Sequence, residues 1–84
     1  MIEKDEISDK KTRELLIGNM DTVKNNIKRL LTEKNMSQAD LAFYAKSNAP
    51  FISYFLRKGG NATIEFIGKL AEVLDTDLRT LLNK

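Results

Sequence analysis

Apolar residues recur three and four positions apart along most of this 84-residue chain, the spacing that places side chains on one face of a helix. No segment alternates apolar and polar residues as a half-buried strand would. The runs consist of Val23, Ile27, Leu30 and Leu31; Leu41, Ala42 and Ala45; Ile52 and Phe55; Ile64, Ile67, Leu70, Ala71 and Leu74; and Leu78, Leu81 and Leu82. The pattern therefore predicts an all-α protein without a sheet.

Residues that cap helices predict where these helices begin. Ser37, Thr63 and Asp77 are expected N-caps, and either Asp21 or Thr22 is expected to cap the helix that contains Val23. In that helix we expect the polar faces to hold Lys24, Asn25, Lys28 and Arg29. A further short helix is predicted over residues 8–17, capped by Ser8 and stopped by Gly18 and Asn19.

The charge divides the chain into two parts. Residues 1–22 hold six acidic and four basic side chains, a net charge of −2, whereas residues 23–84 hold ten basic and six acidic ones, a net charge of +4. We expect residues 1–22 to form an N-terminal extension, with or without the short helix, and residues 23–84 to form a single domain. The positive charge that nucleic-acid binding requires belongs to that domain.

The composition argues against catalysis. The chain has no histidine and no cysteine, and it shows no glycine-rich phosphate loop and no spacing of carboxylates typical of a metal site. We therefore expect no enzyme activity, no metal site and no cofactor. The charged N-terminus and the short apolar runs indicate neither a signal peptide nor a membrane span, so a cytoplasmic protein is expected.

The segment from Ser37 to Arg57 has the spacing of a helix-turn-helix. Ala42 lies five residues after the cap Ser37, and Ile52 lies ten residues after Ala42. A small residue and an apolar anchor at these positions let two short helices cross closely. In such a motif the second helix, here about residues 49–57, enters the major groove of DNA.

Residues 27–42, with the sequence IKRLLTEKNMSQADLA, resemble the opening of the lambda-repressor-like helix-turn-helix family, the Cro and phage-repressor group. Residues 63–74 and 78–82 resemble the fourth and fifth helices of that family. The resemblance covers about three quarters of the chain. It implies a compact five-helix domain, here with an N-terminal extension, that binds operator DNA, often as a symmetric dimer.

Four residues are candidates for contacts with the DNA backbone. Gln38 resembles the family's glutamine that meets a phosphate, although a solvated position is an equal alternative. Arg57 and Lys58, followed by Gly59, Gly60 and Asn61, lie where the relatives clamp the backbone, and we favour phosphate binding there over solvated charges. The first glycine falls one residue later than in most relatives.

The candidate base-reading residues are Asn48, Ala49, Pro50, Phe51, Ser53 and Tyr54. Asn48 could read a base edge, but we favour an N-cap. Phe51 could equally flank the core or contact a partner, and we favour the edge of the core over a base contact. Ala49 and Pro50 offer only apolar contact, for which thymine methyl groups are the natural partners. Ser53 and Tyr54 each have a hydroxyl that could reach a base or a phosphate, or else lie on plain surface.

Lys46 replaces the glycine that is usual in the turn between the two helices. A positive φ at Lys46 would cost on the order of 1 kcal/mol, so either this residue bears that cost or the turn is rebuilt.

Two functions fit these features. The leading hypothesis is a sequence-specific, repressor-like transcriptional regulator that binds double-stranded DNA as a homodimer. The alternative is a helix-turn-helix used as a protein-interaction module, such as an antitoxin-like partner, with Phe51 and Tyr54 in an exposed aromatic patch. Core filling explains most of the apolar residues at Leu15, Leu16, Ile17, Leu78, Leu81 and Leu82, and a dimer contact could explain the rest.

Overall fold

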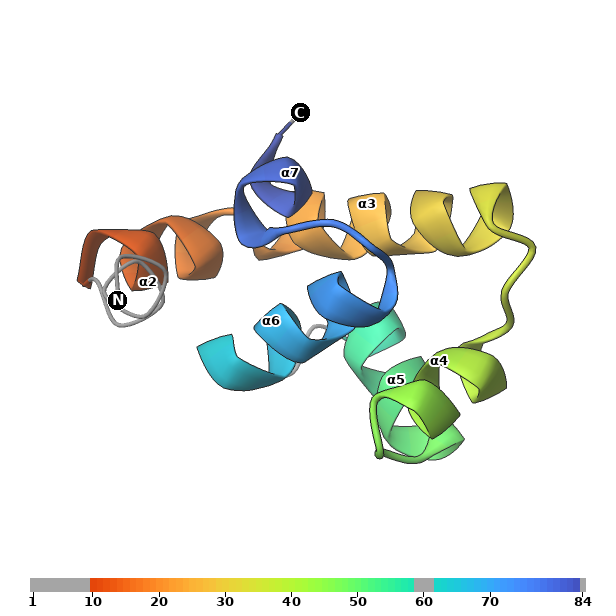
Figure 1. Ribbon diagram of the computed structural model, residues 1–84. Helices are drawn as coiled ribbons and strands as arrows, with labels where there is room; N and C mark the ends of the chain where they lie inside the picture. Colours follow the sequence, from red (N-terminus) through yellow and green to blue (C-terminus); the bar gives the residue numbers. More distant parts are fainter. Residues whose placement is uncertain (1–9, 59–61, 84) are drawn as a thin grey trace.

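A computed structural model describes residues 10–58 and 62–83, and these residues form six α-helices and no strand. The helices are α2 (Lys10–Gly18), α3 (Met20–Glu33), α4 (Gln38–Tyr44), α5 (Ala49–Lys58), α6 (Ile64–Val73) and α7 (Leu78–Leu82). The prediction of an all-α domain of five helices, α3 to α7, preceded by an N-terminal extension is confirmed. In Figure 1, α3 runs along one side of the molecule with α7 against it, α4 to α6 lie on the other side, and α2 extends beyond the start of α3.

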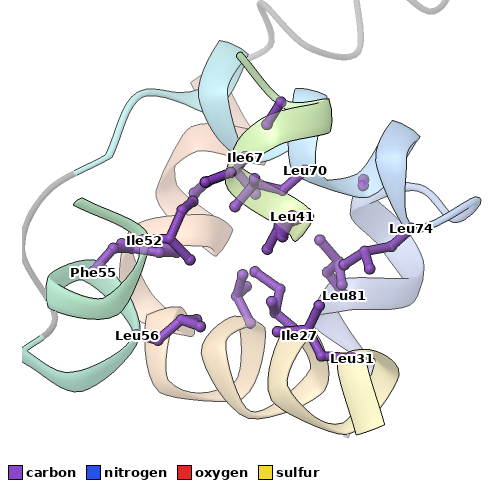
Figure 2. Packing of buried hydrophobic residues seen from close by; sticks show 14 of the residues in the cluster. Ile27, Leu31, Leu41, Ile52, Phe55, Leu56, Ile67, Leu70, Leu74 and Leu81 are labelled. Atoms are coloured by element: carbon purple, nitrogen blue, oxygen red, sulfur yellow. The ribbon is translucent and has the colours of Figure 1, made fainter. Parts of the chain in front are cut away.

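One hydrophobic core joins all six helices (Figure 2). The largest fully buried side chains are Leu16, Val23, Ile27, Leu41, Ile52, Phe55, Ile67, Leu70, Leu74 and Leu81. Of the six apolar residues for which core filling or a dimer contact was expected, Leu16 and Leu81 fill this core, whereas Leu15 and Ile17 of α2 are exposed. The helical spacing in the sequence therefore identified most of the core correctly.

Helix α3 departs from the sequence prediction at its start. It begins at Met20 rather than after Asp21 or Thr22, and Asn19 at the N-cap position makes no cap hydrogen bond with its side chain. Instead, the Asn19 side-chain amide donates to the carbonyl of Leu15, 2.9 Å away, at the end of α2. Helix α3 thus follows α2 after a single residue, and Asn19 satisfies the end of α2. The predicted cap Ser8 lies outside the described residues.

Lys24 was expected on a polar face of α3, and that prediction is wrong. Its side chain is only 6% exposed, and its ammonium nitrogen lies 5.6 Å from the centre of the Phe55 ring of α5. A lysine can bury its aliphatic stem while its charged end remains near the surface, and a cation over an aromatic ring is attracted to it. Lys24 therefore packs α5 against α3.

Helices α4, α6 and α7 begin as the sequence predicts. Ser37, Thr63 and Asp77 each accept a hydrogen bond from a backbone N–H three residues later. At Asp77, the hydrogen bonds from the backbone and side chain of Thr80 are the main cause of a pKa below the ordinary value of the carboxyl. The predicted caps are confirmed at all three positions.

Helices α3, α4 and α6 end in the same way, with a left-handed residue that is not glycine. These residues are Asn35, Lys46 and Asp75, with φ of 58°, 57° and 58°. After α4, the N–H of Ser47 donates to the carbonyl of Ala42 at 2.8 Å and the N–H of Lys46 donates to that of Phe43 at 3.2 Å. This is the Schellman pattern, which satisfies carbonyl groups at a helix end. Lys46 therefore bears the left-handed conformation itself, and the turn is not rebuilt.

We expect Lys46→Gly to stabilise the fold by about 0.5–1 kcal/mol, because glycine adopts a positive φ without the steric cost that lysine has. The matched control is Lys46→Ala, which removes the same charged side chain but keeps the Cβ. Urea denaturation followed by circular dichroism measures both. A Lys46→Gly variant no more stable than Lys46→Ala would show that the turn imposes no strain.

Candidate nucleic-acid interface

Helices α4 and α5 form the helix-turn-helix. A capping box opens α4: the N–H of Asp40 donates to the Ser37 hydroxyl at 2.9 Å, and the N–H of Ser37 donates to the Asp40 carboxylate at 3.2 Å. Ala42 of α4 and Ile52 of α5 are both buried, and α4 and α5 pack against each other. The burial of the small residue and of the apolar anchor agrees with the roles that their spacing predicts.

The outward face of α5 is formed by Pro50, Tyr54 and Arg57. All three are exposed, and their spacing of four and three residues places them on one side of the helix. The opposite side is buried at Ile52 and Phe55. Helix α5 thus presents a narrow face with an apolar ring, a phenol and a guanidinium, arranged from its start to its end.

Ala49 and Ser53 lie at the edge of this face. Both are half-buried, so each can offer only a small area to a partner. Neither the exposed Pro50 nor the methyl group of Ala49 can form a bidentate hydrogen bond with a base. The polar groups that could approach a base from this part of α5 are therefore the hydroxyls of Ser53 and Tyr54.

Asn48 caps α5. Its side-chain oxygen accepts a hydrogen bond from the N–H of Phe51 at 2.8 Å, as an N-cap does. Because the cap occupies one lone pair of the oxygen and holds the amide at the start of α5, Asn48 is less available for a bidentate contact with an adenine edge. The N-cap interpretation of Asn48 is confirmed.

Phe51 lies at the edge of the core. Its side chain is 40% exposed, and its ring packs edge-on against Phe66 of α6 with centroids 5.1 Å apart. Phe66 also lies 6.3 Å from the ring of Phe55. The row of three rings ties α5 to α6, which fits the favoured interpretation of Phe51 as a flank of the core.

The basic and amide candidates for the backbone contacts lie at two helix ends. Gln38 is exposed at the first residue of α4, and Arg57 and Lys58 are exposed in the last turn of α5. Asn61 lies outside the described residues. The structure thus places an amide and two cations at the surface, on both helices of the motif.

An exposed aromatic pair on α4 was missed by the sequence reasoning. Phe43 and Tyr44 are 75% and 61% exposed, and their rings meet edge-on with centroids 5.3 Å apart. The signal was present in the sequence, because Leu41, Ala42 and Ala45 define the buried side of α4 and leave positions 43 and 44 away from it. Among residues 10–58 and 62–83, the pair is a surface feature that packing does not require.

The fold and the exposed face of α5 define a helix-turn-helix protein. A profile of the helix-turn-helix family matches residues 27–81, from within α3 to α7. The chain therefore belongs to the lambda-repressor-like helix-turn-helix family, and the resemblance seen in the sequence is confirmed. This is a family of DNA-binding regulators.

Comparisons with curated proteins and with solved structures gave no match. Among residues 10–58 and 62–83, no group of three or more carboxylate, histidine or cysteine side chains is placed to hold a metal ion. The helices in that part of the chain are all too short or too polar to cross a membrane.

Proposed function

We propose that this protein is a sequence-specific transcriptional regulator that inserts α5 into the major groove of DNA. The observation that carries the proposal is the arrangement of α5 within a helix-turn-helix: one side is locked into the core by Ile52 and Phe55, and the other presents Pro50, Tyr54 and Arg57 to solvent. A helix held rigidly on a scaffold can present its outer side chains to base edges.

The chemistry of α5 favours apolar contact and DNA shape over polar base reading. Pro50 and Ala49 can contact thymine methyl groups, and the cap role of Asn48 leaves Ser53 and Tyr54 as the main polar readers. Arg57, Lys58, Gln38 and Asn61 are proposed to bind phosphates and so to fix the register of the helix on the duplex. The operator is therefore expected to hold thymines opposite the start of α5.

We further propose that the protein acts in the cytoplasm as a homodimer and represses transcription by occupying its operator. A two-fold dimer reads two half-sites related by symmetry, about one helical turn apart or a multiple of it. Selection of binding sites from a random pool of duplexes tests the whole proposal. An enriched palindrome supports it, whereas the absence of any enriched sequence at physiological salt contradicts it.

Arg57→Ala is expected to weaken binding to the selected duplex and to a random duplex by similar factors. The reason is that a phosphate contact contributes the same energy on any sequence. The slope of log affinity against log salt should fall by about 1, the release of one counterion. Fluorescence anisotropy at several salt concentrations measures both quantities.

Tyr54→Ala is the matched comparison on the same face of α5. Because Tyr54 is assigned to base reading, its loss should reduce the preference for the selected duplex while changing the salt slope less than Arg57→Ala does. If Arg57→Ala instead lowered only the preference between duplexes, Arg57 would be a base reader and its assignment here would be wrong.

The second candidate function is a protein-interaction module. The exposed pair Phe43 and Tyr44 favours it, because aromatic residues are enriched where proteins bind one another. The aromatic patch that the sequence predicted at Phe51 and Tyr54 is weaker support for this function, since the ring of Phe51 packs on Phe66. A chain that enriches no duplex would favour this second function.

A further inference from the structure

A solvent-open hollow of about 500 Å³ lies between the second half of α3 and the start of α4. Its polar lining includes Lys28 of α3, Asn35 and Ser37 of the connection, and Gln38 of α4. Leu31 and Met36 also line it. The hollow is therefore shared by the helix-turn-helix and the helix that precedes it.

The lining of the hollow is rich in hydrogen-bond donors and contains no carboxylate. Lys28 supplies an ammonium group, and Asn35 and Gln38 supply side-chain amides. The hydroxyl oxygen of Ser37 accepts from the N–H of Asp40, which leaves the hydroxyl hydrogen for another partner. The carboxylate of Asp40 itself accepts from the N–H of Ser37 in the capping box, and Asp40 is not part of the lining.

Lys28 is an exposed cation without an acidic partner among the residues that the structure describes. The neighbouring ion pair on α3 joins Arg29 and Glu33, 3.0 Å apart, and does not include Lys28. Thr32, one turn after Lys28, donates its hydroxyl to the Lys28 carbonyl at 3.2 Å and so does not engage the ammonium group. The charge of Lys28 is therefore available to an anion from outside the chain.

We propose that this hollow holds a phosphodiester of the DNA backbone, with Lys28 as a phosphate contact that lies outside the helix-turn-helix itself. The inference rests on the proposed function and adds a residue of α3 to the DNA contacts of α4 and α5. A positive, donor-rich and acid-free lining selects an anion with several acceptor oxygens, which is what a phosphodiester offers. Because the hollow is open to solvent, a continuous strand can pass across it.

Gln38 connects the hollow to the proposed interface. It lines the hollow and is also the first residue of α4, where the family resemblance places a phosphate contact. A strand that meets Gln38 thus lies beside Lys28 as well. The anchoring of the protein on DNA then begins on α3 and does not depend on the short helix α4 alone.

The test compares charge removal at Lys28 with charge removal at a second exposed lysine. We expect Lys28→Gln to weaken binding to selected and random duplexes by the same factor and to lower the slope of log affinity against log salt by about 0.9. Lys28→Arg keeps the charge and should retain the wild-type slope. Lys69→Gln of α6, which removes one positive charge away from the hollow, should also retain it.

The outcomes separate this inference from the proposed function. If the wild type binds DNA with a clear salt dependence and Lys28→Gln has the same slope, the hollow is not a phosphate site and the inference is overturned. An equal fall in slope for Lys28→Gln and Lys69→Gln would also overturn it, because it would reflect net charge only. If the wild type binds no duplex at all, the result contradicts the proposed function and, with it, the inference that rests on that function. Thermal unfolding of each variant confirms that the exposed substitutions leave the fold intact.

Discussion

Phe55→Ala is expected to destabilise the fold by about 3–5 kcal/mol, the usual cost of truncating a buried aromatic residue. Phe55 is 1% exposed and packs with Phe66 of α6 and Lys24 of α3. Its removal leaves a cavity where α5 meets both of these helices. Since small domains unfold at a cost of only about 5–15 kcal/mol, much of the total stability should be lost. Urea denaturation at 25 °C measures the change.

Tyr54→Ala is the control for that prediction. It truncates the neighbouring aromatic residue, which is 52% exposed and lies on the outward face of α5. Stability should change by no more than about 0.5 kcal/mol, because surface substitutions seldom cost more. A similar loss for the two variants would contradict the assignment of Phe55 to the core and Tyr54 to the outer face of α5.

The local features of this fold could be predicted from the sequence because they depend on neighbours along the chain. Ser37, Thr63 and Asp77 cap helices with their own side chains, three residues from the N–H groups that they satisfy. The same is true of Asn48. The left-handed turn at Lys46 was one of two alternatives that the sequence left open, because the resemblance places a glycine at this position and the residue type gives only the cost of a positive φ.

Features that depend on distant segments could not be predicted. Lys24 is polar and lies next to Val23, so helical spacing alone assigns it to solvent, whereas its ammonium group lies over the ring of Phe55, 31 positions later in the chain. The start of α3 is a local feature that was nevertheless misplaced, because the Asn19 side chain donates backward to the Leu15 carbonyl instead of capping α3. The hollow beside Lys28 is lined by residues 28–38 alone, but its shape depends on the angle between α3 and α4, which helical spacing does not give.

The exposure of the candidate site residues could be predicted only in part. Residues of α5 follow one helical period, so Ile52 and Tyr54 could be assigned to opposite sides of the helix before the structure was known. The exposed pair on α4 could not be distinguished from ordinary surface residues, because the apolar stripe of Leu41, Ala42 and Ala45 defines only the buried side of that helix. The position of Phe51 is decided by Phe66, which belongs to another helix.

The docking of α7 depends on Asn26 of α3, a residue that no sequence pattern marked. Asn26 is 8% exposed, and its side-chain amide donates to the carbonyl of Leu81 and to that of Asn83, both at 2.7 Å. Its side-chain oxygen accepts from the guanidinium of Arg29 at 3.2 Å. One amide therefore satisfies two carbonyls at the end of a helix of five residues, which has few hydrogen bonds of its own.

Asn26→Ala is expected to destabilise the fold by about 1–3 kcal/mol, because the buried carbonyl of Leu81 loses its donor from α3. Asn26→Asp should lower the free energy of unfolding further, since an ionised carboxylate has no hydrogen-bond donor for the two carbonyl oxygens that it would face. The control is Asn25→Ala, the adjacent and exposed asparagine, for which the change should stay within about 0.5 kcal/mol. Urea denaturation of the three variants decides the question. Equal stability of Asn26→Ala and Asn25→Ala would mean that burial of Leu81 alone holds α7 in place, and that the two hydrogen bonds contribute no net stability.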